Sequence, residues 1–168
     1  PDMICRLCET EQHLIKAHVV PEGFFRVLRD GSGALELQAN AKGTHPRRAP
    51  VGIYDKSILC RRCDNLFSPW DKHAQDVLLR EFSDDLAIYD GSRRIGWMIE
   101  RFDYRPLKLF FLSLLWRASV STHEFYRQVS AGPFAHVLHT MIATAEPGAP
   151  DVFAVTLARC QPAERRPP

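Results

Sequence analysis

Cys5-Arg6-Leu7-Cys8 returns downstream as Cys60-Arg61-Arg62-Cys63, so the chain carries two CxxC knuckles. A CxxC turn points two thiolates at one centre, and two such turns complete the tetrahedron of a structural zinc site. The spacing therefore predicts that Cys5, Cys8, Cys60 and Cys63 bind one zinc ion. Because the stretch 9–59 is longer than the insert of a usual zinc ribbon, we expect the metal to join the two ends of an inserted unit.

Two other interpretations of the cysteines are open. Either pair alone is compatible with a thioredoxin-like redox motif, and the four thiols are also compatible with unrelated buried cysteines. A redox CxxC normally occurs once and near a βαβ pattern, which this sequence does not show. The fifth cysteine, Cys160, stands near the end of a predicted strand and is interpreted as a small buried hydrophobic residue.

Composition limits the class of protein. A chain of 168 residues with 45% hydrophobic and 25% charged residues can build one core, as soluble globular proteins do. The net charge of +2 is too small to indicate a nucleic-acid binder, so that function must depend on local arginine clusters. Three arginine pairs meet this requirement: Arg47-Arg48, Arg61-Arg62 and Arg93-Arg94.

The sequence also predicts the compartment. The first residues lack the basic start and apolar run of a signal peptide, and the longest apolar run, Leu107 to Trp116, is too short to cross a bilayer. Cysteines at zinc-ligand spacing favour a reducing compartment over a disulfide framework. We therefore expect a cytoplasmic protein without a membrane partner.

Local patterns predict the elements of the first half. A short strand over 14–20 carries His18, and a helical turn follows over 21–28. Alternation over 34–39 predicts another strand. The basic stretch 42–50 is expected to be an exposed loop or edge. A helix is expected to start at Arg61, over 61–67.

Ser68-Pro69-Trp70-Asp71 combines a serine cap, proline at the first helical position and an acid three residues after the cap, so we expect a second helix there. Its expected buried face comprises Trp70, Ala74, Val77, Leu78 and Phe82.

The second half is expected to carry the apolar core. Residues 86–89 and 95–102 predict a hairpin around Asp90-Gly91, and 107–116 a central helix. Ser121 and Glu124 form a capping box for a helix that ends near Gly132. Pro133 opens the next helix, and alternation over 152–157 predicts a final strand. The inward residues of the helix after Pro133 are expected to be Phe134, Val137, Leu138, Met141 and Ile142.

Three features together resemble a known family. Cys5xxCys8, His18 followed by Pro21, and Leu59-Cys60xxCys63-Asp64 are similar to the motifs of zinc-stapled members of the HNH nuclease family. The resemblance covers about residues 4–70. It implies the ββα-metal fold and metal-assisted cleavage of DNA.

The resemblance assigns roles residue by residue. His18 matches the general base, Asp55 falls where the family has an asparagine, and Asp64 falls at the last metal-ligand position. Ala17 occupies the place of the first metal ligand and cannot hold a cation. The carboxylate of Asp55 is expected to orient His18 by accepting its ring N–H.

A catalytic divalent cation (Mg²⁺, Mn²⁺ or Ni²⁺) would need donors besides Asp64. The candidates are Glu22, Asp55, Asp71 and His73. His13, His45, His123, His136 and His139 are interpreted as surface or packing residues.

The expected fold class is α+β: a small HNH-like ββα unit stapled by a four-cysteine zinc site over 1–83, then a mainly helical half with a few strands over 84–160. Residues 161–168 are expected to be a disordered tail.

Two functions follow from the sequence. The first is an HNH-like endonuclease acting on DNA, in genome defence or on mobile DNA, with Arg61, Arg62, Arg47 and Arg48 contacting phosphates. The second is a catalytically inactive zinc-stabilised module that binds nucleic acid or a protein partner. A homodimer is compatible with either function.

Overall fold

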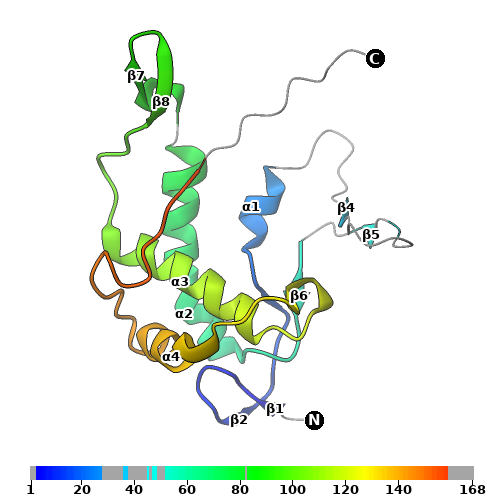
Figure 1. Cartoon of the computed structure of the whole chain (residues 1–168). Coiled ribbons are helices and arrows are strands. Elements are labelled where there is room, and N and C mark those ends of the chain that lie inside the picture. The colour runs from blue at the N-terminus through cyan, green and yellow to red at the C-terminus, as the bar shows by residue number, and fades with distance from the viewer. Residues whose placement is uncertain are drawn as a thin grey trace.

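The computed structural model describes residues 3–27, 36–37, 45, 47–48, 52–81 and 83–158 (Figure 1). Its strands form four separate antiparallel pairs, β1–β2, β3–β6, β4–β5 and β7–β8. The strands are β1 (Met3–Ile4), β2 (Glu11–Gln12), β3 (Ala17–His18), β4 (Glu36–Leu37), β5 (Arg47–Arg48), β6 (Tyr54–Asp55), β7 (Ala87–Asp90) and β8 (Arg93–Trp97). The helices are α1 (Glu22–Arg26), α2 (Arg61–Gln75), α3 (Tyr104–Val120) and α4 (Ala135–Thr144). Four shorter helical turns are η1 (Asp76–Arg80), η2 (Asp84–Leu86), η3 (Glu124–Tyr126) and η4 (Gly132–Phe134).

Strands β3 and β6 together with helix α2 make a small ββα arrangement. Ala17 pairs with Asp55 and His18 with Tyr54. A further antiparallel bridge joins Leu14 to Cys60, the residue directly before α2. The sequence predicted a strand over 14–20, and the structure keeps a two-residue strand within it.

Helix α2 is one continuous helix, so the prediction of two helices divided at Ser68 is wrong. Pro69 lies inside α2. The buried side chains before and after the proline fall on one helical face, with spacings of three and four residues, and this shared face is a physical reason for continuity. They are Cys63, Phe67, Trp70, Ala74 and, within η1, Val77.

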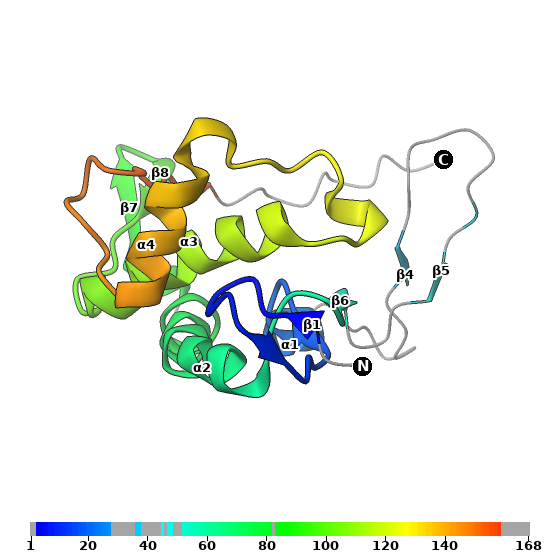
Figure 2. The same cartoon turned by 90° about the horizontal axis from the view of Figure 1, so that it is seen from below.

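The main hydrophobic core joins the two predicted halves of the chain. Helix α3 packs against both α2 and α4 (Figure 2). The Phe67 ring lies 5.6 Å from the Trp70 ring and 6.1 Å from the Trp116 ring of α3, measured between centroids. Leu109, Phe110 and Trp116 are buried, which confirms the predicted central helix.

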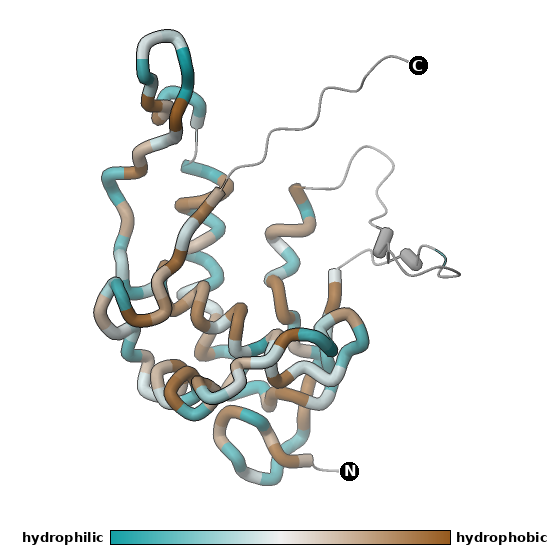
Figure 3. Tube along the Cα trace, in the orientation of Figure 1, coloured by the Kyte–Doolittle hydropathy of each residue, from teal (hydrophilic) through white to brown (hydrophobic). Residues whose placement is uncertain are grey.

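Strands β7 and β8 form the hairpin expected around Asp90-Gly91. Asp90 pairs with Arg93, and a register shift lies between Ile88 and Tyr89. The hairpin projects from the helical body (Figure 1). Hydrophobic as well as hydrophilic residues follow its strands (Figure 3).

Two predictions for the later segments are wrong. The segment after Ser121 forms only the short turn η3 and not a helix to Gly132. Ser121 Oγ donates instead to Asp55 Oδ2 at 2.9 Å, so this side chain serves a tertiary contact and not a capping box. Within 152–158 the chain is irregular and not a strand, and Lys108 Nζ binds the carbonyl of Val152 at 2.9 Å.

Helix α4 follows η4, as the proline predicted. Its Leu138, Met141 and Ile142 are buried, but Phe134 and Val137 are 59% and 47% exposed, so the prediction that they face inward is wrong. The burial predictions for Phe82 and Cys160 and the prediction for the tail 161–168 lie outside the described residues. No helix in the described part of the chain is long and apolar enough to cross a bilayer.

Candidate functional site

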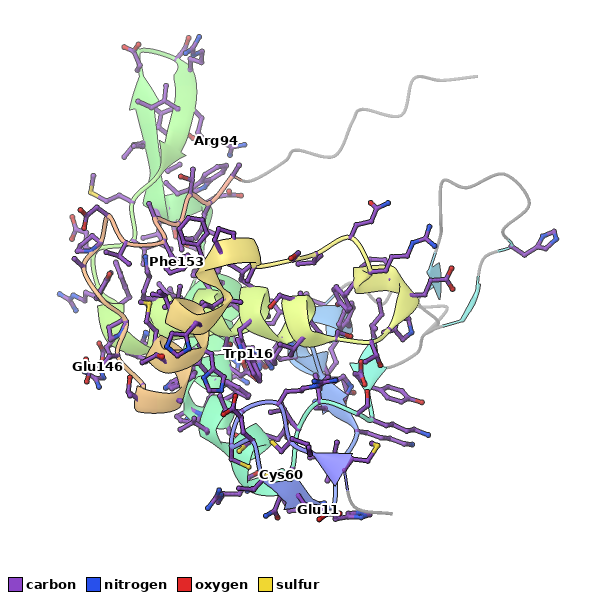
Figure 4. All side chains as sticks on the ribbon, turned by 60° about the horizontal axis from the view of Figure 1, so that its bottom comes forward. Glu11, Cys60, Arg94, Trp116, Glu146 and Phe153 are labelled. Carbon is purple, nitrogen blue, oxygen red and sulfur yellow. The ribbon has the colours of Figure 1, made fainter. Side chains whose placement is uncertain are left out.

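The four knuckle cysteines form one cluster. The Sγ atoms of Cys5, Cys8, Cys60 and Cys63 all lie within 4.8 Å of one another. A zinc ion with ordinary Zn–S bonds holds its sulfurs about 3.8 Å apart, so a small contraction converts this cluster into a tetrahedral site. Cys60 directly precedes α2 (Figure 4), and its N–H donates to Cys5 Sγ of the first knuckle at 3.4 Å. The donor set fits a structural zinc ion.

Electrostatics around the cluster favour a thiolate at Cys8. Burial alone raises the pKa of Cys8, but hydrogen bonds from Thr10 and from the thiols of Cys5 and Cys63 lower it to about 6. Arg62 reinforces this charge, because a hydrogen bond to Cys8 and the charges of the cysteines raise the pKa of its guanidinium. A deprotonated sulfur is the form that binds metal.

Hydrogen bonds fix the first knuckle to its surroundings. Arg6 N donates to the carbonyl of Ile58 at 2.8 Å, and His139 Nε2 of α4 lies 2.9 Å from the carbonyl of Leu7. His139 is thus a packing residue, one of the two roles that the sequence suggested. Through it the later half of the chain contacts the first cysteine knuckle.

His18 lies on β3, in the ββα arrangement. Its ring is partly buried and meets the ring of Tyr54 edge-on, with 6.1 Å between centroids. His18 Nε2 is buried and has no hydrogen-bond partner among the described residues. A buried polar atom without a partner costs free energy, so this nitrogen is a candidate to receive a proton or a ligand.

Two carboxylates of α2 lie close enough to His18 to interact with its charge. They are Asp64 in the first turn and Asp71 about two turns later, on the same helix face. Burial raises the pKa of Asp64, while the charges of Arg117 and His18 act in the opposite direction. His18 and Asp64, the two residues that the resemblance paired, therefore lie within electrostatic range of each other.

Arg117 of α3 lies with His18 and Asp71 in the candidate site. It was not identified from the sequence. The residue is only 1% exposed. Its guanidinium binds both oxygens of Asp71, at 2.8 and 3.2 Å, and donates to the carbonyl of His18 at 3.1 Å. It also donates to Ser113 Oγ at 3.0 Å and lies over the ring of Phe67 at 4.9 Å. An arginine directly after the apolar run Leu107 to Trp116 was the available signal, because a buried arginine requires a partner.

Asp55 has different partners from the one expected. Its carboxylate accepts hydrogen bonds from the N–H and hydroxyl of Ser57, from the Ser121 hydroxyl and from the N–H and hydroxyl of Thr122, at 2.6 to 3.1 Å. Burial raises the pKa of Asp55, but these bonds lower it to about 2. Oδ1 thus binds the neighbouring Ser57, and Oδ2 joins β6 to the residues that follow α3, so both oxygens have partners other than His18.

The other candidate donors have partners too. Glu22 Oε1 lies 3.2 Å from Arg26 Nε, and His73 Nε2 lies 3.1 Å from the carbonyl of Asp103. Within the described ranges, the cysteines are the one group of three or more metal-binding side chains. Ala17 is fully buried and offers no ligand. A cation beside His18 would therefore need oxygens from water and substrate besides Asp64.

The predicted phosphate-binding arginines fall in two places. Arg61 and Arg62 are exposed in the first turn of α2, next to the cysteines and Asp64. Arg47 and Arg48 form β5, and their side chains lie outside the described part of the structure.

Comparison of the chain with protein-family models, with curated proteins and with solved structures finds no match. The chemistry of the site therefore has to follow from this chain's own residues.

Proposed function

We propose that the protein is an HNH-like, metal-dependent endonuclease that hydrolyses phosphodiester bonds of DNA, in defence against phage or mobile elements. The observation that carries the proposal is the buried, unpartnered Nε2 of His18 on β3, within electrostatic range of Asp64 of α2. A histidine on the strand pair and an acid at the helix start are two of the features on which the resemblance to the ββα-metal family is based.

His18 is assigned the role of general base. In its neutral form the imidazole accepts a proton from water at Nε2 while the water oxygen attacks phosphorus. The bond from phosphorus to the leaving sugar oxygen breaks, and that oxygen takes a proton from solvent. Arg117 keeps the His18 backbone in place through its carbonyl.

Asp64 is assigned the role of holding a divalent cation. Such a cation, when bound, neutralises charge that develops on the phosphate. The partly buried carboxylate of Asp64 lies near Arg61, whose exposed side chain is suited to contact the DNA backbone. The zinc ion of the four cysteines would fix the start of α2 and therefore the position of Asp64.

A second candidate is a catalytically inactive, zinc-stabilised module that binds nucleic acid or a protein. Two observations favour it: Ala17 supplies no ligand, and Asp71 is neutralised by Arg117. Such a module would need only the zinc.

The proposal is tested by incubating zinc-loaded protein with DNA and with Mg²⁺, Mn²⁺ or Ni²⁺. We expect divalent-dependent cleavage that is strongly reduced in Asp64→Asn and retained in Asp76→Asn, a substitution further along the same helical segment. Binding of DNA without cleavage under every metal condition would favour the inactive module.

A further inference from the structure

The β7–β8 hairpin has little packing support within its own chain. Neither buried hydrophobic cluster of the described chain contains a residue of the hairpin. Each of its two strands has one neighbour in the described sheets, so each presents an outer edge. A lone two-stranded hairpin is marginally stable in water, and open edges readily pair with another chain. These features indicate a surface that is covered in an assembly.

The exposed residues of this hairpin are unusually apolar for a projecting loop. Tyr89 is 59% exposed and Ile95 54%, and Met98 directly after β8 is 52% exposed. Ile88 is also exposed, and its side chain lies over Gly96. A Cβ atom at position 96 would lie 3.5 Å from Ile88 Cδ1. Burying this apolar surface would be favourable.

Charges are distributed differently at the two ends of the hairpin. The tip carries Asp90 opposite Arg93. Arg94 is engaged within the chain, with Asp84 at 3.6 Å and the Trp97 ring at 4.6 Å. The base is a groove that contains three acids and one arginine. The acids are Glu81, Asp85 and Glu100, the arginine is Arg101, and Ile88 and Met98 also line the groove.

We propose that the hairpin is a homodimer interface, in which two copies pack their hairpins side by side and in opposite directions. A two-fold axis places the same patch of each copy against the other, so the tip of one hairpin meets the base of its partner. Arg93 then faces the acids of the groove, Glu100 among them, and Asp90 faces Arg101. Ile88, Ile95 and Met98 become buried between the copies. This interface does not depend on the nuclease assignment.

A charge exchange tests the interface in the full zinc-loaded chain. Sedimentation equilibrium of the wild type should give twice the 19.2 kDa chain mass. Arg93→Glu places like charges at both symmetric contacts, and so does Glu100→Arg. Each variant alone should therefore dimerise about tenfold more weakly or worse. In a mixed dimer of the two variants, both symmetric contacts pair opposite charges, one with the charges exchanged and one as in the wild type. The mixture should therefore dimerise again. Arg127→Glu, an exposed site beyond the other end of α3, should dimerise like the wild type.

Three outcomes would overturn the interface. They are a wild type that stays monomeric at every concentration, a dimer that neither substitution weakens, and single variants whose mixture stays monomeric. A monomer whose affinity for DNA falls in Arg93→Glu would assign the hairpin to nucleic acid instead.

Discussion

Arg117 Nη1 donates a hydrogen bond to the main-chain carbonyl of His18 at 3.1 Å, across 99 positions of the chain. The same guanidinium binds both carboxylate oxygens of Asp71. One side chain of the core helix α3 therefore holds strand β3 and helix α2 together. The later half of the chain is part of the site.

Removing Arg117 should destabilise the protein strongly. In Arg117→Met the mostly buried Asp71 carboxylate, 17% exposed, loses its partner, so we expect a loss of about 3 kcal/mol in the free energy of unfolding. Urea unfolding of zinc-loaded protein measures this change. The double variant Arg117→Met/Asp71→Leu should recover part of the loss, because no unpaired charge remains. A loss below about 1 kcal/mol in Arg117→Met would mean that the pair is not a structural link.

Protonation of Asp55 should account for part of the loss of folding stability in acid. Its pKa is about 2 in the folded protein against an ordinary value of 3.8, so the ionised form is favoured by folding. That stability is present above about pH 4 and is lost as the pH falls through about 2, and it amounts to about 2 kcal/mol. Unfolding measured across this pH range should show the decrease in the wild type, and Asp55→Asn should lack this contribution. An equal decrease in both proteins would contradict the assignment.

Zinc should be required for folding. Four cysteines from distant knuckles hold the start of α2, and ligand binding by such a site is coupled to folding. Metal analysis should find one zinc per chain, and Cys60→Ser should lower both zinc content and melting temperature. His136→Ala, on the exposed face of α4, is the control. An unchanged metal content in Cys60→Ser would refute the four-cysteine site.

Arg61 and Arg62 should supply affinity for the nucleic-acid backbone. Substituting both with glutamine should weaken binding to all DNA sequences similarly and reduce the salt slope by about one for each phosphate that these side chains neutralise. Fluorescence anisotropy at several salt concentrations measures both effects. Because Arg62 also interacts with Cys8, zinc content must be matched, and Arg61→Gln alone separates the two roles. An unchanged salt slope would remove these arginines from the interface.

Local sequence signals predicted the parts of the fold that local chemistry determines. The CxxC spacing predicted the cysteine cluster, and Asp90-Gly91 predicted the hairpin. Pro69 misled the prediction for α2, because the helical face that is buried on both sides of it depends on tertiary packing.

The polar partners in the candidate site were harder to predict. Asp55 meets Ser121 and Thr122, and His18 meets Arg117, only after α3 packs against the ββα arrangement. No local spacing encodes such distant pairs. His18 and Asp64 were found through the family resemblance. For Arg117 the sequence offered only a charged residue directly after an apolar run.

Cleavage of DNA by His18→Ala, measured beside the wild type at equal zinc content and with the same divalent cation, tests the nuclease assignment most directly. Loss of a general base should lower the cleavage rate about 100-fold or more. The fold should remain, since His18 is not one of the zinc-binding cysteines, and an unchanged melting temperature would verify this. His136→Ala, a histidine substitution on the exposed face of α4, should cleave like the wild type. Cleavage by His18→Ala at the full wild-type rate would contradict the assignment.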